Sequence, residues 1–292
     1  MTKTIETLIS DIHELLGGKN PLEFVEDGNV LARNFAGRME SLVANRVLFP
    51  TPRTPRLSPS NIGRPCTRQT WLEVNKPEVV EPLTPITRLK FLYGDIIEEL
   101  LLFLAEAAGH SVEGRQDRVE IEGIHGSRDA IIDGVLVDVK SASTYSFAKF
   151  RDGSLVDNDP FGYIGQIQTY LAASIEDPLV TDKTRCAFFV MDKTLGHICL
   201  DIHPRVEFDV REITRNKIEM INSPTMPDRG FQPVPEGKSG NMKLPMECGY
   251  CSVKHACHDN IRTFLYSYGP MHLTTVAKEP NVPELRKEIV AE

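Results

Sequence analysis

The sequence predicts an α/β fold in which helices flank a mixed central sheet. The first observation is a helical pattern over residues 86–108 that stops at Gly109. The second is a group of strand-like runs directly after it, and the third is a return to helix, strands and helix. In chain order these later segments are strands at 118–122, 128–132 and 135–141, a helix at 161–174, strands at 185–191 and 197–202, and a helix at 206–221. Helices alternating with clustered strands are typical of an α/β core.

The flanking segments differ in composition from this core. Helical patterns followed by the proline-rich run Pro50–Pro55 predict an N-terminal helical region and linker over residues 1–57. The core is expected at 58–245, although its end, from Ser223 to Pro245, has the composition of a loop. A cysteine-bearing segment at 246–270 and a charged tail at 271–292 complete the predicted organisation.

Composition limits the class of protein. The chain has 292 residues, 41% hydrophobic and 25% charged, as globular domains do. It contains no run of about 20 apolar residues, so we expect no membrane span. The N-terminus, MTKTIETLISDIHELLGG, lacks the apolar core of a signal peptide. We therefore expect a cytoplasmic location, where the six cysteines are metal ligands or buried thiols rather than disulfides.

The charge balance disfavours nucleic acid as a partner overall but permits it locally. The net charge is −8. The segment from Arg53 to Lys90, however, holds seven basic and three acidic residues, a balance of +4. Such a segment can contact a phosphate backbone, or it can simply be a solvated charged face.

A two-residue hairpin is the most informative local feature. Asp133-Gly134 lies between two apolar runs, and this dipeptide favours a type I′ turn. Counting outward from the turn pairs Ile132 with Val135 and places Asp129 opposite Asp138. Lys140, two residues farther on, falls on the same side of the sheet.

Two opposed carboxylates repel each other unless a cation lies between them. Their oxygen ligands suit Mg²⁺ or Mn²⁺, and we expect Asp129, Asp138 and the carbonyl of Val139 to bind such an ion. Lys140 can then orient a water or stabilise charge on a phosphate. The alternative interpretation is a hairpin with scattered surface charges.

The preceding helix offers a further carboxylate. On a helical wheel Asp95, Glu99 and Glu106 form a predicted solvent face, whereas Glu98 lies at the edge of the apolar face. Glu98 is therefore a candidate third ligand, although an ordinary boundary glutamate explains the pattern equally well. Gln166 and Tyr170 share one face of the helix at 161–174 and can bind phosphate or a catalytic side chain, as can any polar patch there.

Four of the six cysteines form a candidate metal site. Cys248, Cys251 and Cys257 follow a C-x2-C-x5-C pattern, and Cys66 is the expected fourth ligand. Cys186 and Cys199 lie in apolar strand patterns and are expected to be buried free thiols. Four thiolates suit Zn²⁺ or a [4Fe–4S] cluster, and their spacing does not decide between the two.

Together these residues resemble the iron–sulfur subgroup of the RecB-like PD-(D/E)XK nucleases, which includes the CRISPR adaptation exonuclease, the AddB nuclease domain and phage-encoded relatives. The match covers residues 58–260. The motif G-x-x-D corresponds to Gly126–Asp129, (D/E)-x-K to Asp138–Lys140, and Q-x-x-x-Y to Gln166–Tyr170. Many members have a histidine on the first core helix, where this chain has Glu98.

The resemblance implies a restriction-endonuclease-like core and a [4Fe–4S] cluster on Cys66, Cys248, Cys251 and Cys257. It also implies Mg²⁺- or Mn²⁺-dependent hydrolysis of DNA, as an exonuclease on single-stranded ends in replication, recombination or repair, with a helicase or recombination protein as a possible partner. Two alternatives remain: a DNA-binding or partner-docking protein with a vestigial nuclease site, and a zinc-stapled structural protein.

Overall fold

The computed structural model describes residues 3–18, 27–51 and 55–285, and its internal contacts divide the chain into two compact units. Unit 1 comprises residues 1–63 and 83–215, and unit 2 comprises residues 64–82 and 216–292. Residues 52–54 of the expected linker, Arg53 among them, and residues 286–292 of the expected tail lie outside the described residues. Each unit is described by itself.

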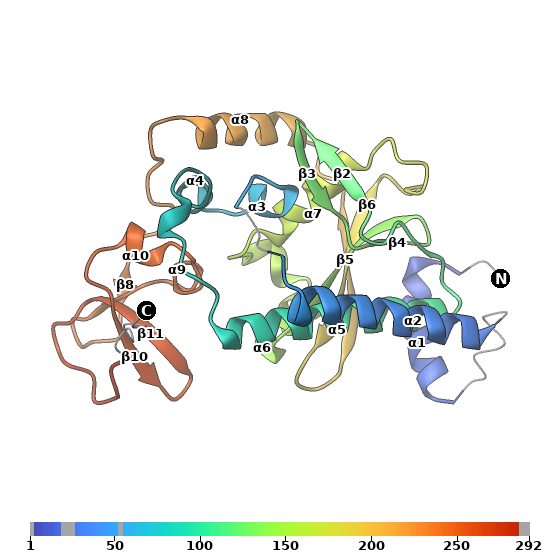
Figure 1. Ribbon diagram of the computed structural model, residues 1–292, viewed down its shortest axis with the longest axis horizontal. Helices are drawn as coiled ribbons and strands as arrows, with labels where there is room; N and C mark the ends of the chain where they lie inside the picture. Colours follow the sequence, from blue (N-terminus) through green and yellow to red (C-terminus); the bar gives the residue numbers. More distant parts are fainter. Residues whose placement is uncertain (1–2, 19–26, 52–54, 286–292) are drawn as a thin grey trace. The chain divides into compact units, whose positions relative to one another are not determined.

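Unit 1 contains the strands that the sequence predicts, with helices before, between and after them (Figure 1). Its helical elements are η1 (Ile5–Thr7), α1 (Leu8–Leu16), α2 (Gly28–Val43), the π-helical turn η3 (Ala44–Leu48), α3 (Pro59–Ile62), α5 (Pro85–Ala107), α6 (Thr144–Arg151), η5 (Ser154–Asp157) and α7 (Tyr163–Ala173), and α8 (Val210–Asn222) begins in this unit. Its strands are β1 (Val112–Glu113), β2 (Arg118–Ile121), β3 (Ile124–Ser127), β4 (Ala130–Ile132), β5 (Val135–Ala142), β6 (Arg185–Asp192) and β7 (Ile198–Pro204).

The central sheet has the strand order β1-β4-β5-β6-β7. Strands β5 and β6 run parallel, and the other neighbouring pairs are antiparallel. The parallel pair is joined by a crossover through α6 and α7, as parallel strands require. Strands β2 and β3 form a separate antiparallel ribbon. The predicted mixed sheet flanked by helices is thus confirmed at the level of α/β architecture.

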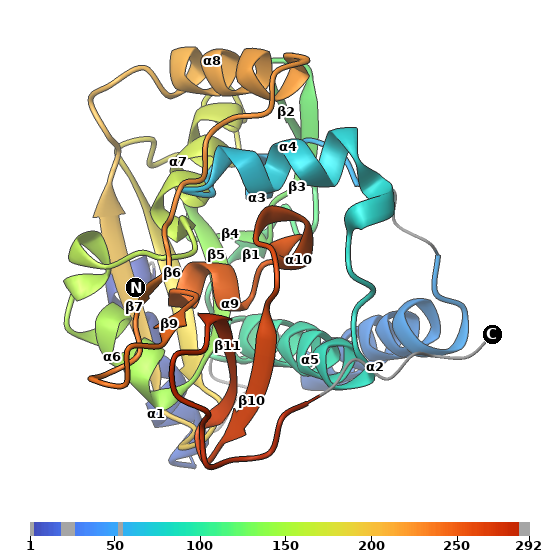
Figure 2. The same cartoon turned by 90° about the vertical axis from the view of Figure 1, so that its left-hand side faces the viewer.

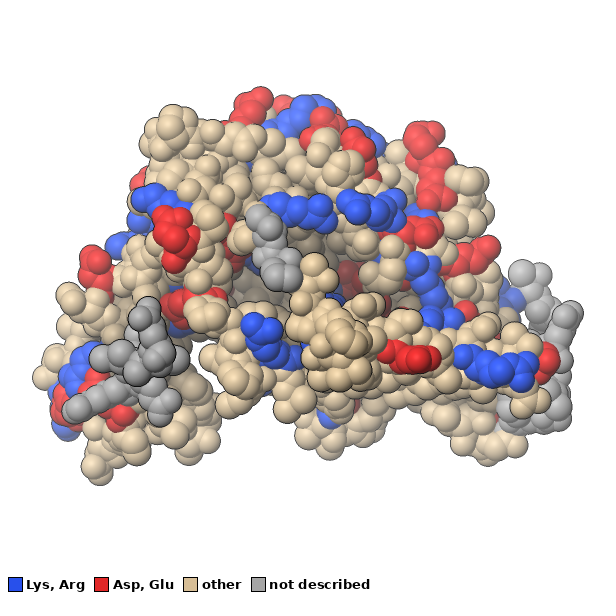
Figure 3. All heavy atoms as spheres, viewed as in Figure 1, with Lys and Arg blue, Asp and Glu red and all other residues tan. Residues whose placement is uncertain are grey.

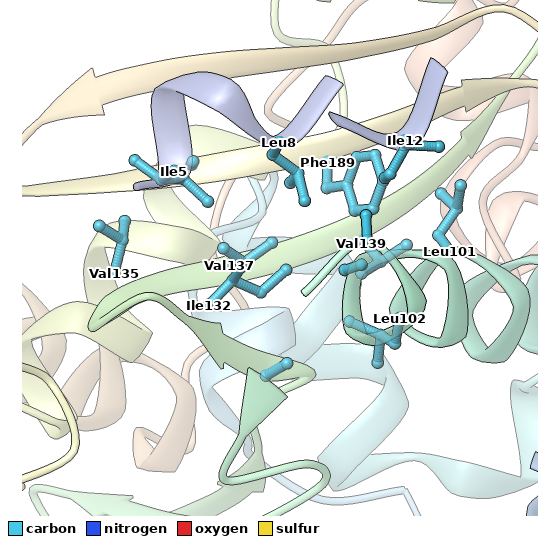
Figure 4. Packing of buried hydrophobic residues seen from close by; sticks show 14 of the residues in the cluster. Ile5, Leu8, Ile12, Leu101, Leu102, Ile132, Val135, Val137, Val139 and Phe189 are labelled. Atoms are coloured by element: carbon cyan, nitrogen blue, oxygen red, sulfur yellow. The ribbon is translucent and has the colours of Figure 1, made fainter. Parts of the chain in front are cut away.

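Side chains of β5 alternate between two hydrophobic clusters, one on each face of the sheet. Val135, Val137 and Val139 pack in one cluster with α1 and α5, and Figure 4 shows Leu101 and Leu102 of α5 beside them. Leu136 belongs to the other cluster, which α6 and α7 cover. Both faces are buried, which is why β5 reads as an almost continuous apolar run.

The N-terminal helix α1 is part of this core rather than an appendage. Ile5, Leu8 and Ile12 are almost fully buried against the sheet, as Figure 4 shows. The expectation of a separate region over residues 1–57 therefore does not describe α1. Helix α1 has one apolar face, and this face is buried against the side of the sheet that α5 also covers.

The prediction that Asp95, Glu99 and Glu106 of α5 face solvent is also wrong, because α2 lies along this helix (Figure 1). Arg38 pairs with Glu99 and Glu106, at 3.0 and 3.3 Å, and Arg46 pairs with Asp95 at 2.6 Å. A helical wheel separates polar from apolar positions but does not show that ion pairs with a second helix will cover the polar ones.

Unit 2 is built from short helices and a four-stranded antiparallel sheet of order β10-β11-β9-β8. Figure 2 labels β9, β10 and β11 of this sheet. Its elements are α4 (Thr67–Asn75), η4 (Pro77–Val79), the end of α8, β8 (Val234–Pro235), β9 (Met242–Lys243), α9 (Met246–Gly249), α10 (Lys254–Cys257), β10 (Arg262–Tyr266) and β11 (Gly269–Thr275). Two expectations are corrected here. The loop expected from Ser223 to Pro245 contains β8 and β9, and residues 271–275 of the expected tail belong to β11.

Acidic and basic side chains are interspersed over the face that Figure 3 shows. In the described part of the chain, no helix has both the length and the apolar composition needed to cross a lipid bilayer.

Candidate catalytic site and cysteine site

The β4–β5 hairpin has the predicted register. Ile132 pairs with Val135, and Ala130 pairs with Val137. Both turn residues have positive φ, 50° at Asp133 and 81° at Gly134, as a type I′ turn requires. A side chain at Gly134 would also collide with Thr181, because its Cβ would lie 1.9 Å from the Thr181 hydroxyl oxygen. Turn geometry and close packing therefore both require glycine there.

This register brings Asp129 and Asp138 together at the open end of the hairpin. They stand one step beyond the pair Ala130–Val137. Oδ2 of Asp129 accepts a hydrogen bond from the backbone N–H of Val139, 2.8 Å away, so Asp129 reaches across to the neighbouring strand. The sequence predicts the carbonyl oxygen of Val139 as a metal ligand. In the structure it is the backbone N–H of Val139 that contacts the site, through its hydrogen bond to Asp129.

Helix α5 adds the carboxylate of Glu98 to this pair. Burial raises the pKa of Glu98 to about 7, and the charges of Asp138, Glu99 and Asp95 raise it as well. Burial also raises the pKa of Asp129 well above its usual range, with further increases from the charges of Asp138 and Glu98. The charge of Asp138 thus acts on two partly dehydrated carboxylates, and this repulsion favours the binding of a proton or a cation.

Lys140 is the cation of this site. Its ammonium lies 2.5 Å from Oδ2 of Asp138 and 5.0 Å from the ring centroid of Tyr163. Burial by itself would lower the pKa of Lys140, but the charges of Asp138 and Asp129 outweigh burial and raise it. Lys140 therefore stays charged, held between a carboxylate and an aromatic ring. Sequence reasoning missed Tyr163, which begins α7, because its pairing with β5 depends on how the helix docks.

Gln166 and Tyr170 share a face of α7, as predicted, and that face looks onto the site. The amide of Gln166 donates to Oδ1 of Asp138 at 3.3 Å. Burial raises the pKa of Tyr170 to about 12, and the charges of Asp129 and Asp138 add to the increase. Tyr170 thus stays a neutral phenol, able to donate a hydrogen bond at any ordinary pH.

The four residues Gly126–Asp129 have divided roles. A Cβ at Gly126 would lie 2.8 Å from Pro59 and 2.9 Å from the Tyr170 hydroxyl, so glycine is needed there. Arg128 turns away from Asp129 and is buried, with its guanidinium paired to Asp117 at 3.1 Å and to Asp177 at 2.7 Å. Of these four residues only Asp129 belongs to the carboxylate site.

The carboxylate site has oxygen donors that suit a divalent cation, but their side chains are not arranged around a common point as metal ligands are. Oδ2 of Asp138 is buried without a well-directed hydrogen bond, although the Lys140 ammonium is its close neighbour. Among the described residues, no three His, Cys, Asp or Glu side chains stand in an arrangement that could hold a metal ion. The oxygen donors suit Mg²⁺ or Mn²⁺, and the binding assignment for Glu98, Asp129, Asp138 and Val139 remains a prediction.

The four cysteines expected at a metal site all belong to unit 2. Cys66 stands at the N-cap of α4, Cys248 lies in α9, and Cys257 ends α10. Burial raises the pKa of Cys248 to about 11, and the charges of Cys66 and Cys257 add to it. Burial likewise raises the pKa of Cys251 to about 12, with contributions from Glu73, Cys248 and Cys66. The charges of these cysteines therefore act on one another, although within the described residues no three of them are arranged to hold a metal ion.

Basic side chains lie near two of the cysteines. Arg229 donates to the carbonyl of Cys257 at 2.9 Å, and Lys217 donates to the carbonyl of Arg64, two residues before Cys66. Nε2 of the buried His258 has no hydrogen bond within the described residues. A metal–thiolate centre carries net negative charge, so this basic surrounding fits one. Cys186 and Cys199 are buried in β6 and β7, as predicted.

Comparison with known proteins adds little. No family model and no curated protein matches the chain. One solved structure, described as the crystal structure of SSO0001, aligns with 76% of this chain and 95% of its own at 14% sequence identity and a TM-score of 0.40. The assignment of function therefore depends on the site.

Proposed function

We propose that the chain is a divalent-metal-dependent DNA nuclease of the RecB-like PD-(D/E)XK type. The observation that carries this proposal is that Asp138 pairs with the half-buried Lys140 while its charge also acts on Glu98 and Asp129. Burial raises the pKa values of Glu98 and Asp129, and the charge of Asp138 raises both further. Three carboxylates near one another destabilise a fold through their repulsion. Beside a charged lysine, however, they can bind a metal ion for phosphoryl transfer.

Each residue has a role that follows from its place. Glu98, Asp129 and Asp138 would hold Mg²⁺ or Mn²⁺, together with the Val139 carbonyl. A bound metal lowers the pKa of a coordinated water and polarises a phosphoryl oxygen. Lys140 stabilises the negative charge that develops on the phosphate. Gln166 orients Asp138, and the neutral Tyr170 supplies a hydrogen-bond donor to the substrate or to the carboxylates.

The cysteine site is proposed to hold a [4Fe–4S] cluster. Cys66, Cys248, Cys251 and Cys257 are close enough for their charges to interact, and basic groups surround them. These features fit iron–sulfur and zinc alike, and the resemblance to the iron–sulfur subgroup favours iron. Its role would be to tie α4 to the segment of α9 and α10, because a covalent link between distant residues lowers the entropy of the unfolded chain.

The proposed substrate is DNA with single-stranded ends, and the proposed reaction is exonucleolytic. The test is digestion of 5′- and 3′-labelled single-stranded DNA by the protein purified anaerobically, with Mg²⁺, Mn²⁺ or EDTA. Metal-dependent release of short products that is lost in Asp138→Ala supports the proposal. DNA binding without cleavage in wild type would instead identify a vestigial site.

A further inference from the structure

Gln116 has a backbone conformation that its residue type disfavours. Its φ is 54°, in the left-handed region that few residues other than glycine, asparagine and aspartate adopt. Such a conformation costs about 1 kcal/mol or more and persists only where the surroundings enforce it. Gln116 is not one of the residues proposed to bind the metal or the substrate.

The loop that carries Gln116 is clamped on two sides. Arg115 pairs with Glu99 at 3.3 Å and with Glu106 at 2.8 Å, which fastens the loop to α5. On the other side the Arg128 guanidinium donates to the carbonyl of Gly114 at 3.3 Å. The hydrogen bonds of both clamps are partly buried, so the loop has little freedom to relax.

The clamped loop places Gln116 between two members of the carboxylate site. Its backbone N–H donates to the carbonyl of Asp129, 3.2 Å away. Its side-chain amide donates to Oε1 of Glu98 at 2.7 Å. The contact engages one carboxylate oxygen of Glu98 and leaves Oε2 for another partner. Because an amide N–H is neutral, it can hold a carboxylate without competing with the metal for that carboxylate, as a charged lysine would.

We propose that Gln116 is a positioning residue that orients Glu98 for metal binding. This inference rests on the proposed function, because it requires Glu98 to bind the metal. Groups that hydrogen-bond a metal ligand fix its orientation, and removing one typically lowers metal affinity about 10- to 100-fold. The positive φ of Gln116 is then explained, because this backbone conformation places its side-chain amide within hydrogen-bond distance of Glu98.

The test separates positioning from a structural role. Gln116→Asn suits the left-handed conformation better but is one methylene too short to reach Glu98, so the melting temperature should hold or rise while the Mn²⁺ dissociation constant rises about 10-fold or more. Mn²⁺ binding is measured by the loss of the free-ion electron paramagnetic resonance signal, without reference to activity. The matched control is Glu122→Asn, at another non-glycine residue with positive φ (51°), which should change stability but not Mn²⁺ affinity.

A double-mutant cycle completes the experiment. If Gln116 acts through Glu98, then adding Gln116→Asn to Glu98→Ala should cause no further loss of Mn²⁺ affinity. Unchanged Mn²⁺ affinity in Gln116→Asn, with a loss in Glu98→Ala, would overturn the role of Gln116 alone. Equal affinity in wild type and Glu98→Ala would overturn the proposed metal site and this inference with it.

Discussion

The ammonium of Lys140 lies 2.5 Å from Oδ2 of Asp138, two residues earlier on the same strand. This pairing is a consequence of strand geometry, because residues i and i+2 face the same side of a sheet. It keeps a positive charge beside Asp138, where the proposed function requires a phosphate to bind.

The first prediction concerns this pair. Lys140→Ala should lower kcat for DNA cleavage by about 100-fold or more, since a preorganised cation is lost. Mn²⁺ affinity should hold or increase, because Asp138 loses its competing partner. Asp138→Ala should lose both cleavage and Mn²⁺ affinity. Calorimetric titration with Mn²⁺ distinguishes the two, and an equal loss of affinity in both variants would contradict the role given to Lys140.

The second prediction is a pH dependence of stability. The pKa of Glu98 is raised to about 7 and that of Asp129 is raised as well, so the folded protein binds protons that the unfolded chain releases. Without metal, the free energy of unfolding contributed by these groups should be fully present below about pH 4 and fall as the pH rises through 7. Urea titrations in EDTA at several pH values measure this.

Added Mn²⁺ should reverse that loss, because the metal binds the ionised carboxylates. The stabilisation by Mn²⁺ should therefore grow from pH 6 to pH 8. Asp129→Asn provides the control, since it removes one titrating group and should flatten the pH profile measured in EDTA. A profile identical to that of wild type would show that the coupled carboxylates do not cause the effect.

The third prediction concerns Gly63. A Cβ at this position would lie 2.4 Å from the backbone nitrogen of Gln166 and 2.8 Å from the carbonyl oxygen of Gly162, both on or beside the first turn of α7. Gly63→Ala should lower the free energy of unfolding by about 1–3 kcal/mol and reduce cleavage, because Gln166 moves away from Asp138. Gly37→Ala in α2 meets no atom within 4 Å and should be stabilising by up to about 1 kcal/mol without loss of activity.

The fourth prediction concerns the cysteines. Replacing Cys66, Cys248, Cys251 or Cys257 with serine should remove the visible absorption and the bound iron of the anaerobically purified protein. Cys186→Ser should retain both, because Cys186 is buried in β6 of unit 1, whereas the four expected ligands belong to unit 2. Colourless wild-type protein that contains zinc would overturn the iron–sulfur assignment while leaving the four-cysteine site in place.

Loss of the cluster should affect stability more than chemistry. A link across about 180 residues stabilises a fold by roughly 5 kcal/mol in the loop-entropy model used for disulfides. The carboxylates lie in unit 1, so Mn²⁺ affinity should survive in Cys251→Ser, whereas proteolysis of unit 2 should become faster. Loss of Mn²⁺ affinity in this variant would show that the two sites are coupled.

The sequence by itself determined the features that depend on neighbouring residues. The turn at Asp133-Gly134 needs two positive φ angles, and this local chemistry set the pairing of Ala130 with Val137 and the meeting of Asp129 with Asp138. The shared face of Gln166 and Tyr170 follows in the same way from helical spacing.

Only the tertiary structure decided which distant groups share the site. Nothing in the local pattern places Gln116 on Glu98 or the Tyr163 ring beside Lys140, because both contacts depend on how a loop and a helix dock. The burial of α1 and the ion pairs of Arg38 with α5 depend equally on long-range packing. Periodicity records which side of an element is apolar, but the identity of the element that covers it is a property of the folded chain.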